Sequence, residues 1–302
     1  EVVTMRLAET ASPAALVELL GEIDATRAPL HPLLLQGWLR LFGNSEAAAR
    51  ALSVLFGVGT VALLGLLGGL TFGRSTGVWA MALGAISPLL VYYSREVRMY
   101  APLVFLTTLA WTLLFALRER PGRGKTIGYG ATLAAMILTH PLGLIMAGTL
   151  ATASLLDLEG FFGGRRRWAG VHAGVLILLS PWLRRYFDHD PEFLSGRLPL
   201  KFLLGTPIGF LGGNFPTLAA TGILIGFGVL RRLWAADRPP RAWLAPACLA
   251  VWLVLPPVVL YAYSWAKSPI FGPARYSLFC APAYLVLVAQ GLAKLPLLAR
   301  ST

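Results

Sequence analysis

The sequence predicts an all-α integral membrane protein: a polytopic bundle of about nine transmembrane helices, with interfacial helices in its first outer loop. Two observations predict this fold. Of the 302 residues, 56% are hydrophobic and only 13% are charged, whereas soluble domains have roughly 25% charged residues. Long apolar runs also recur along the chain. The two cysteines, Cys248 and Cys280, each lie inside an apolar run, so they predict neither a disulfide framework nor a thiolate metal site.

Residues 1–46 form the first predicted domain, an outer loop with interfacial helices. Ser12 and Pro13 predict the start of a helix over Pro13–Ile23, whose leucines and glutamates fall on different faces. This pattern favours a helix lying on the membrane surface. The next apolar segment, Leu33–Phe42, is shorter than the ~20 residues that span a bilayer. We therefore expect it to be an interfacial or re-entrant helix.

Residues 47–302 form the second predicted domain, the transmembrane helical domain. Its predicted spans are Ala47–Leu70, Val78–Tyr93, Ala101–Leu117, Thr126–Thr139, Leu142–Leu156, Val171–Leu183, Pro207–Leu230, Leu244–Tyr263 and Tyr276–Leu292. The short loops at 118–125, 165–167 and 231–241 are strongly basic, which is typical of loops that face the cytoplasm. The opposite, non-cytoplasmic face then collects most of the acidic residues and looks like the face that carries a site.

The net charge of +12 does not predict a nucleic-acid partner, because the basic residues fall mainly in short loops between apolar runs. The sequence also contains no Gly-rich phosphate loop, no nucleophile elbow and no zinc-spaced set of cysteines or histidines. Hydrolysis by a serine triad and nucleotide binding are therefore unsupported.

The stretch Tyr92–Tyr100 places two arginines and a glutamate between two apolar runs. Ionisable residues are costly there unless they lie at a membrane surface or line a wet cavity, so they indicate a functional site. If the stretch is helical, Arg95 and Arg98 share one face, and Glu96 and Tyr100 share another. Two arginines on one face can grip a phosphate. The alternative is a structural ion pair at the end of a span.

Other candidates lie on the same predicted face. Glu1, with Asp24 and Arg27, places carboxylates on the outer loop, where they can act as a general base or hold a divalent metal; the alternative is solvated surface charge. Arg275 follows a loop rich in proline and glycine and reaches the outer end of the last span, where a snorkelling arginine is the alternative. His140 sits at a sharp corner between two spans, although a lone histidine is more often simply packed.

A series of short motifs runs in order along nearly the whole chain: Glu1-Val2-Val3-Thr4, Asp24, Ala28-Pro29-Leu30, Trp38, Phe42-Gly43, Ser45-Glu46, Arg50, Tyr93–Tyr100, Thr139-His140, Pro181-Trp182 and Arg275-Tyr276. Their order and spacing resemble those of the GT-C superfamily of membrane glycosyltransferases, and within it the protein mannosyltransferase and aminoarabinose transferase branch. The resemblance implies that a first span and the family's usual catalytic aspartate precede Glu1, so that the chain is truncated at its amino end. The family's His-Pro-Pro element is replaced by Arg27-Ala28-Pro29, with His31 displaced.

The resemblance implies transfer of a sugar, with inversion, from a polyprenyl-phosphate-linked donor to a glycan, lipid or protein acceptor. The reaction would take place on the non-cytoplasmic face of the inner (plasma) membrane, in contact with membrane lipids. The residues it implies are Glu1, Asp24 and Glu96 for catalysis; Arg98, Arg275, Tyr100 and Tyr276 for the donor phosphate; and Arg27, His31, Arg95 and His140 for further contacts to the acceptor or donor. A divalent metal (Mg, Mn or Ca) would be held by Glu1 and Glu96.

Two other functions stay open. A transporter or flippase for an anionic lipid or solute would place its ionisable residues near the middle of the bilayer, often in repeated halves. Here the charges lie at span ends, and no clear internal repeat is present. A non-catalytic membrane scaffold, related to the enzymes but inactive, is the third hypothesis, motivated by the aspartate that is missing from this chain.

Overall fold

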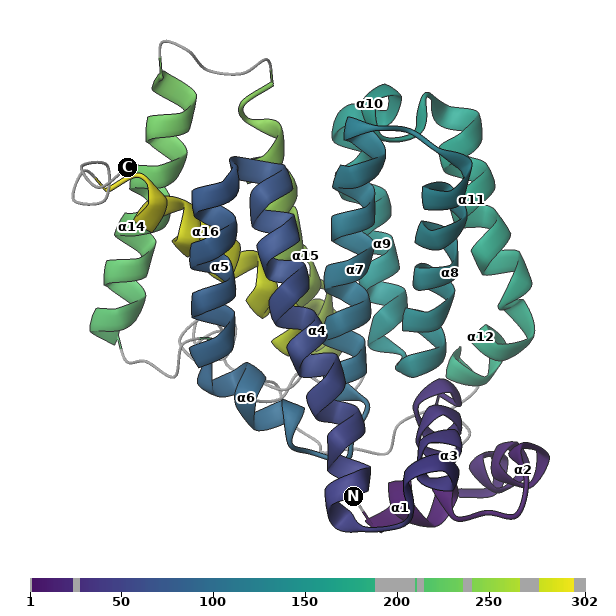
Figure 1. Ribbon diagram of the computed structural model, residues 1–302. Coiled ribbons are helices and arrows are strands. Elements are labelled where there is room, and N and C mark those ends of the chain that lie inside the picture. The colour runs from purple at the N-terminus through teal and green to yellow at the C-terminus, as the bar shows by residue number, and fades with distance from the viewer. Residues whose placement is uncertain are drawn as a thin grey trace.

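The computed structural model describes residues 2–23, 28–187, 210, 215–235, 241–266 and 277–295. All regular elements in these ranges are helices. Figure 1 shows long helices standing side by side, with the short helices α1, α2, α3 and α6 gathered at one end. The amino-terminal helices are α1 (Val2–Ala8), α2 (Pro13–Ile23) and α3 (Leu30–Phe42).

The bundle consists of α4 (Glu46–Phe72), α5 (Arg74–Ile86), α6 (Pro88–Ser94), α7 (Tyr100–Glu119), α8 (Arg123–Thr139), α9 (Leu142–Ser154), α10 (Leu158–Phe162), α11 (Arg165–Leu178), α12 (Ser180–Phe187), α14 (Phe215–Trp234), α15 (Leu244–Ala266) and α16 (Ala281–Ala293). Single 3₁₀ turns lie at Leu155–Asp157 and Leu278–Cys280.

Within the described residues, 5 helices are long and apolar enough to cross a membrane, and up to 6 if the bent pair α5–α6 counts as one span. The 5 are Glu46–Phe72, Tyr100–Glu119, Leu142–Phe162, Pro216–Trp234 and Leu244–Trp265. The other three predicted spans correspond to the shorter helices α8, α11 with α12, and α16. An all-helical polytopic membrane fold is therefore confirmed, while the number nine stays a prediction.

Aromatic residues mark the ends of the spans. Leu244–Trp265 has 22 residues, and at ~1.5 Å per residue it is about 33 Å long, close to the thickness of the hydrocarbon core. Trp243, before its first turn, is 44% exposed, and Trp265, at its other end, is 58% exposed. Tryptophans prefer the two membrane–water interfaces, so these positions are consistent with a helix that crosses the bilayer.

The predicted span Val78–Tyr93 is bent, because α5 and α6, which together are apolar enough for one span, meet at an angle of 59°. Pro88 begins α6 and has no N–H to continue the helical ladder, and Ser87 before it has an extended backbone (ψ 115°). The Ser87 hydroxyl, which is buried, donates a hydrogen bond of 2.9 Å to the carbonyl of Phe210. The bend directs α6, which carries Tyr92 and Tyr93, across the end of the bundle.

The predicted helix over Pro13–Ile23 is confirmed, and Ser12 accepts a 3.1 Å hydrogen bond from the backbone N–H of Ala15. Its predicted position at the membrane surface stays a prediction. Leu16 and Leu20 are at most 1% exposed and pack with Leu7 of α1. The leucines of α2 therefore pack against its neighbouring helices, while its glutamates remain exposed.

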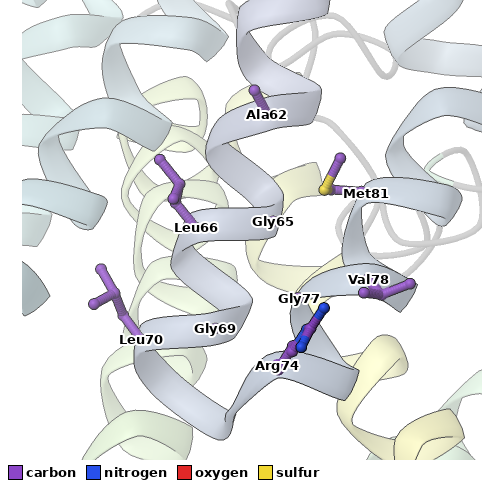
Figure 2. Close-up of a pocket in the computed structure, with 9 residues that line it drawn as sticks. All are labelled: Ala62, Gly65, Leu66, Gly69, Leu70, Arg74, Gly77, Val78 and Met81. Carbon is purple, nitrogen blue, oxygen red and sulfur yellow. The ribbon is translucent and has the colours of Figure 1, made fainter.

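Small residues bring α4 and α5 together (Figure 2). A Cβ atom built on Gly77 would lie 2.5 Å from the carbonyl oxygen of Gly65, and one on Gly68 would lie 3.0 Å from the Cα atom of Gly77. In membranes, such residues let two helix backbones approach closely and gain dispersion contacts that larger side chains would prevent. The α4–α5 hairpin is therefore a tightly packed unit.

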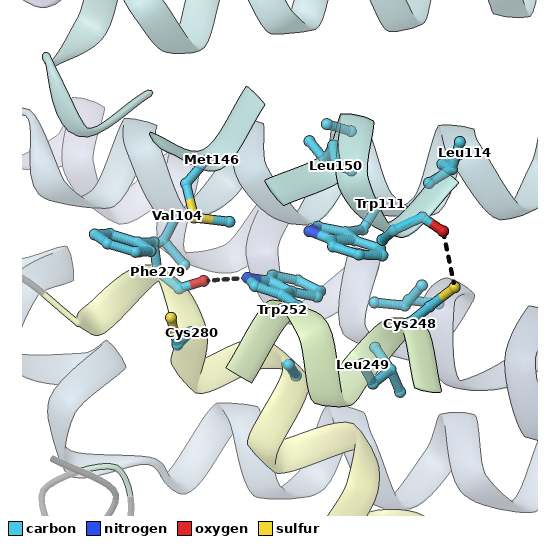
Figure 3. Close-up of a cluster of buried hydrophobic side chains, with 14 of the residues drawn as sticks. Val104, Trp111, Leu114, Met146, Leu150, Cys248, Leu249, Trp252, Phe279 and Cys280 are labelled. Atoms are coloured by element: carbon cyan, nitrogen blue, oxygen red, sulfur yellow. Dashed lines mark hydrogen bonds between the residues drawn. The ribbon is translucent and has the colours of Figure 1, made fainter. Parts of the chain in front are cut away.

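Two stacked tryptophans occupy the centre of the buried core (Figure 3). The rings of Trp111 on α7 and Trp252 on α15 are 4.9 Å apart and nearly parallel, at 6°. Trp252 Nε1 donates a 2.8 Å hydrogen bond to the carbonyl of Phe279. Because all three residues are buried, this pair joins α7, α15 and the turn before α16 with both apolar and polar contacts.

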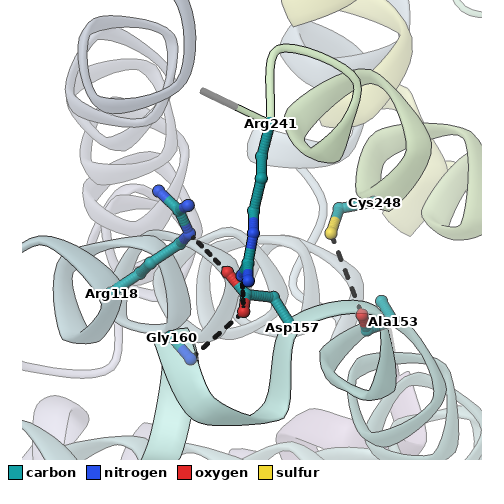
Figure 4. A network of polar contacts seen from close by, with 6 residues as sticks. All are labelled: Arg118, Ala153, Asp157, Gly160, Arg241 and Cys248. Carbon is teal, nitrogen blue, oxygen red and sulfur yellow. Dashed lines mark hydrogen bonds and ion pairs between the residues drawn. The ribbon is translucent and has the colours of Figure 1, made fainter. Parts of the chain in front are cut away.

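The end of the bundle away from α6 carries a network of charges (Figure 4). The Asp157 side chain is 2% exposed and accepts a 2.9 Å bond from Arg118 Nε and a second ion pair from Arg241. It also caps α10 by accepting from the N–H of Gly160 at 3.2 Å. Two of the predicted cytoplasmic loops, 118–125 and 231–241, therefore meet at one end of the molecule.

We expect Trp252→Phe to lower the free energy of unfolding by about 1–3 kcal/mol, since it leaves the buried carbonyl of Phe279 without its donor. Thermal unfolding of the purified protein in detergent measures this. Trp234→Phe is the matched control, because Trp234 is 81% exposed and should shift stability by no more than about 0.5 kcal/mol. Equal shifts for both variants would contradict the role of the stack.

His31 lies on α3 and is 2% exposed. Its Nε2 atom is buried and has no hydrogen-bond partner among the described residues. Burial lowers the pKa of the His31 imidazole to about 4, because the charged form loses its hydration. The histidine is therefore neutral in the folded protein at pH 7.

The pKa of His31 predicts acid sensitivity. Below pH 6.5 the unfolded chain binds a proton that the folded chain does not accept until about pH 4. Stability present above pH 6.5 is thus lost progressively as the pH falls through this window, by up to about 3 kcal/mol. The variant His31→Phe should flatten this part of the curve of unfolding temperature against pH. Parallel curves for the two proteins would contradict the prediction.

Candidate functional site

The segment Tyr92–Tyr100 lies at the end of the bundle opposite the Asp157 network and connects α6 to α7. The segment does not meet the condition of being helical throughout, since residues 95–99 form turns and bends. The N–H of Arg95 bonds to the carbonyl of Tyr92 at 3.1 Å, and the N–H of Arg98 bonds to the carbonyl of Glu96 at 2.9 Å. The helical argument for a shared face of Arg95 and Arg98, and of Glu96 and Tyr100, therefore does not apply.

Side chains of α4 hold this turn through its backbone. Arg50 donates to the carbonyl of Arg95 and is itself paired with Glu46 at 2.8 Å. Ser53 Oγ donates a 2.6 Å hydrogen bond to the carbonyl of Glu96. These contacts use backbone oxygens and so do not occupy the side chains of Glu96 and Arg98. Arg50 belongs to the motif series in the sequence but had no assigned role, and Ser53 carried no sequence signal.

Two packing contacts add rigidity. Val97, at the middle of the turn, is 4% exposed and lies in a cluster with Leu35 of α3 and Leu52 of α4. A Cβ atom on Gly57 would lie 2.6 Å from the Cβ atom of Ser94, so glycine is required where α4 meets the last residue of α6. The turn is thus fixed from both sides, as a precise binding site requires.

Aromatic rings extend the cluster toward the corner between α8 and α9. Tyr100 is 4% exposed, and the centre of its ring lies 5.2 Å from the centre of the Tyr93 ring and 6.1 Å from that of the His140 ring. Arg98 places its guanidinium carbon 5.8 Å from the centre of the Tyr100 ring, within cation–π range. His140 Nδ1 accepts a 3.0 Å hydrogen bond from the N–H of Leu142, so the neutral ring carries its proton on Nε2.

Glu96 has an unusual carboxylate. Its Oε2 atom is buried and has no hydrogen-bond partner among the described residues. A buried carboxylate oxygen is costly unless a donor or a cation satisfies it. The Glu96 carboxylate therefore has an oxygen that can still accept a hydrogen bond or bind a cation.

A divalent cation fits the chemistry of this oxygen, since Mg²⁺ and Ca²⁺ prefer carboxylate ligands. The described part of the chain contains no group of three His, Cys, Asp or Glu residues able to hold a metal. Glu96 would therefore supply one ligand, and the others would have to come from substrate, water or residues outside the described ranges. The second expected metal ligand, Glu1, is among those outside.

The structure brings four of the expected site residues into one region: Glu96, Arg98, Tyr100 and His140. Arg95 is exposed beside them. His31 is enclosed within the packing of α3 and is closed to a substrate in this structure. The remaining expected residues lie outside the described residues: Glu1, Asp24, Arg27, Arg275 and Tyr276.

The charged side chains of this region determine which chemical groups it can bind. A guanidinium held against an aromatic ring suits an oxyanion such as a phosphate. An unsatisfied carboxylate in the same turn can orient a hydroxyl group or a cation. Groups fixed in advance around a developing negative charge are the usual means by which proteins stabilise an anionic leaving group.

Solved structures share the fold. The protein is similar to ArnT from Cupriavidus metallidurans in its apo state, with a TM-score of 0.62 and 18% sequence identity. It is also similar to the same ArnT bound to undecaprenyl phosphate, with a TM-score of 0.62 and 20% identity. Both comparisons cover 97% of this chain, but the chain spans only 55% and 56% of the ArnT chains.

Sequence comparison gives the family. No curated protein matches the chain. Residues 26–184 match the family described as dolichyl-phosphate-mannose-protein mannosyltransferase. The matched range includes α3, the Tyr92–Tyr100 turn and the His140 corner, so it contains the whole described part of the candidate site. The chain belongs to the dolichyl-phosphate-mannose-protein mannosyltransferase family.

Proposed function

We propose that this protein transfers a sugar from a polyprenyl-phosphate-linked donor to an acceptor on the non-cytoplasmic face of the plasma membrane. The observation that supports it most is the Arg98–Tyr100 pair beside the unsatisfied Glu96 carboxylate, at the end of the bundle away from the basic loops. Family membership and the likeness of the fold to an ArnT that binds undecaprenyl phosphate support the class of donor.

In this proposal an acceptor hydroxyl oxygen attacks the anomeric carbon of the sugar. The bond from that carbon to the oxygen of the lipid phosphate breaks, and the lipid phosphate leaves with the electron pair. A carboxylate takes the proton of the hydroxyl group, with Glu1, Asp24 and Glu96 as the candidates in this chain. One displacement at the anomeric carbon inverts its configuration. The acceptor, which is a glycan, lipid or protein, is set by contacts that include Arg27, Arg95 and His140.

Arg98 has the phosphate-binding role, together with Arg275, Tyr100 and Tyr276. The guanidinium meets the negative charge that grows on the leaving phosphate, and the ring of Tyr100 restricts where the guanidinium lies. A divalent metal (Mg, Mn or Ca) held by Glu96 and Glu1 would neutralise part of the same charge. The contacts of Arg50 and Ser53 to the turn maintain this geometry without touching the donor.

Sugar transfer from polyprenyl-phosphate sugars, measured with the purified protein in liposomes, tests the proposal. We expect Arg98→Gln to reduce the rate about 10²–10³-fold, as does the loss of one preorganised donor at an oxyanion, and Arg98→Lys to retain part of the activity. Arg123→Gln is the charge-matched control, because Arg123 is an exposed residue at the opposite end of the bundle.

The proposal fails if the protein transfers no sugar, or if Arg98→Gln changes neither donor binding nor rate. Flux of an anionic lipid or solute into liposomes, without any transfer, would identify a transporter instead. Glu96→Gln separates the roles of the carboxylate. It keeps the shape of the side chain but removes its charge, so a loss of metal dependence assigns Glu96 to the cation, and a loss of rate alone assigns it to the acceptor.

A further inference from the structure

An apolar groove lies on the surface of the α4–α5 hairpin, far from the candidate site (Figure 2). Its cavity volume is about 660 Å³, within the range of about 300–1,000 Å³ of small-molecule sites. The lining residues are Ala62, Gly65, Leu66, Gly69, Leu70, Arg74, Gly77, Val78 and Met81. Arg74 is the one charged residue among them, and every other lining residue is apolar or glycine.

The dimensions of the groove match one leaflet of a bilayer. From Ala62 to Leu70 it follows eight residue steps of α4, about 12 Å at ~1.5 Å per residue. Half of the ~30 Å hydrocarbon core is about 15 Å. Leu66 and Val78, on its two walls, are 59% and 60% exposed, as expected for side chains that meet lipid tails. The groove is thus about as long as the part of an acyl chain that crosses one leaflet.

The positive charge at the Arg74 end of the groove determines which lipid headgroup can bind there. Arg74 is the first residue of α5, is exposed, and makes no hydrogen bond or ion pair with any residue that the structure describes. A second cation lies near the same turn, because the guanidinium carbon of Arg232 is 4.9 Å from the Phe72 ring. These positive charges favour a phospholipid headgroup with a net negative charge over a zwitterionic headgroup, whose ammonium group they would repel.

We infer that this groove binds an anionic phospholipid of the leaflet at the Arg74 end. One acyl chain lies in the groove on the outer surface of the α4–α5 hairpin, and the phosphate pairs with Arg74. This is the end that carries the basic loops, which the sequence predicts to be cytoplasmic, and the cytoplasmic leaflet is the one with the negative surface potential. The inference does not depend on the proposed transferase activity.

Retention of lipid by the purified protein tests the inference. The protein is extracted from bilayers of equimolar phosphatidylglycerol and phosphatidylcholine, and the lipids that stay bound are identified by native mass spectrometry. We expect the wild type to retain phosphatidylglycerol preferentially. Arg74→Gln should reduce this preference about fivefold, the effect of one cationic side chain at an anionic membrane surface. Arg123→Gln, which removes an exposed charge elsewhere at the same end, should leave it unchanged.

A second pair of variants tests the acyl-chain site. A Cβ atom on Gly69 would meet no atom within 4 Å, so Gly69→Leu can fold and fill the groove, and it should release both lipids. Gly148→Leu on α9 is equally open but lies outside the groove, and it should keep them. Equal lipid retention by the two leucine variants, or equal preference in the two glutamine variants, overturns the inference. The inference is also overturned if the wild type is a dimer and Gly69→Leu dissociates it, because a second copy of the chain would then occupy the groove.

Discussion

The structure depends on how a largely apolar bundle accommodates its few ionisable groups, because a charge away from water requires a partner. At one end Asp157 has two arginines and a backbone N–H, and these contacts connect the ends of α7, α10 and the residues before α15. At the other end the Glu96 carboxylate has a buried oxygen that no described residue satisfies. The first arrangement is complete without a ligand, so it stabilises the fold. The second is incomplete, and this difference is the physical reason to place function at the Glu96 end.

The candidate site owes its geometry to an interruption of regular structure. Pro88 ends the helical ladder and turns α6 across the bundle, and the following residues leave the helix altogether. Irregular backbone near a membrane needs other partners for its polar groups. Here Arg50 and Ser53 of α4 supply them, and Val97 anchors the turn in apolar packing. The side chains of Glu96 and Arg98 are therefore presented by a turn that contacts from α4 stabilise in addition to its own backbone hydrogen bonds.

Local signals in the sequence predicted local structure well. Ser12 and Pro13 gave the correct start of α2, and the apolar run at Ala101–Leu117 lies within α7. Sequence reasoning failed where contacts between residues far apart in the sequence determine the local structure. The spacing of Arg95 and Arg98 is equally compatible with a helix and a turn, and only the contacts from α4 distinguish them. The burial of α2 depends on α1 and α3, which its own pattern of leucines cannot reveal. The bend at Pro88 did have a signal, since a proline within an apolar run disfavours a straight helix.

Helix α4 contacts both regions to which we assign a ligand. Its first turns bind the site turn directly through Arg50 and Ser53, and its last turns form one wall of the groove that ends at Arg74. The other wall belongs to α5, which is separated from the site turn by the break at Ser87. Because the turn contacts α4 at Arg50 and Ser53, more than two helical turns before the first groove residue, Ala62, a lipid that fills the groove can stabilise the hairpin without contacting the site turn. Lipid binding should therefore act on the stability of the fold, while the geometry of the turn that carries Arg98 is set at the opposite end of the same helix.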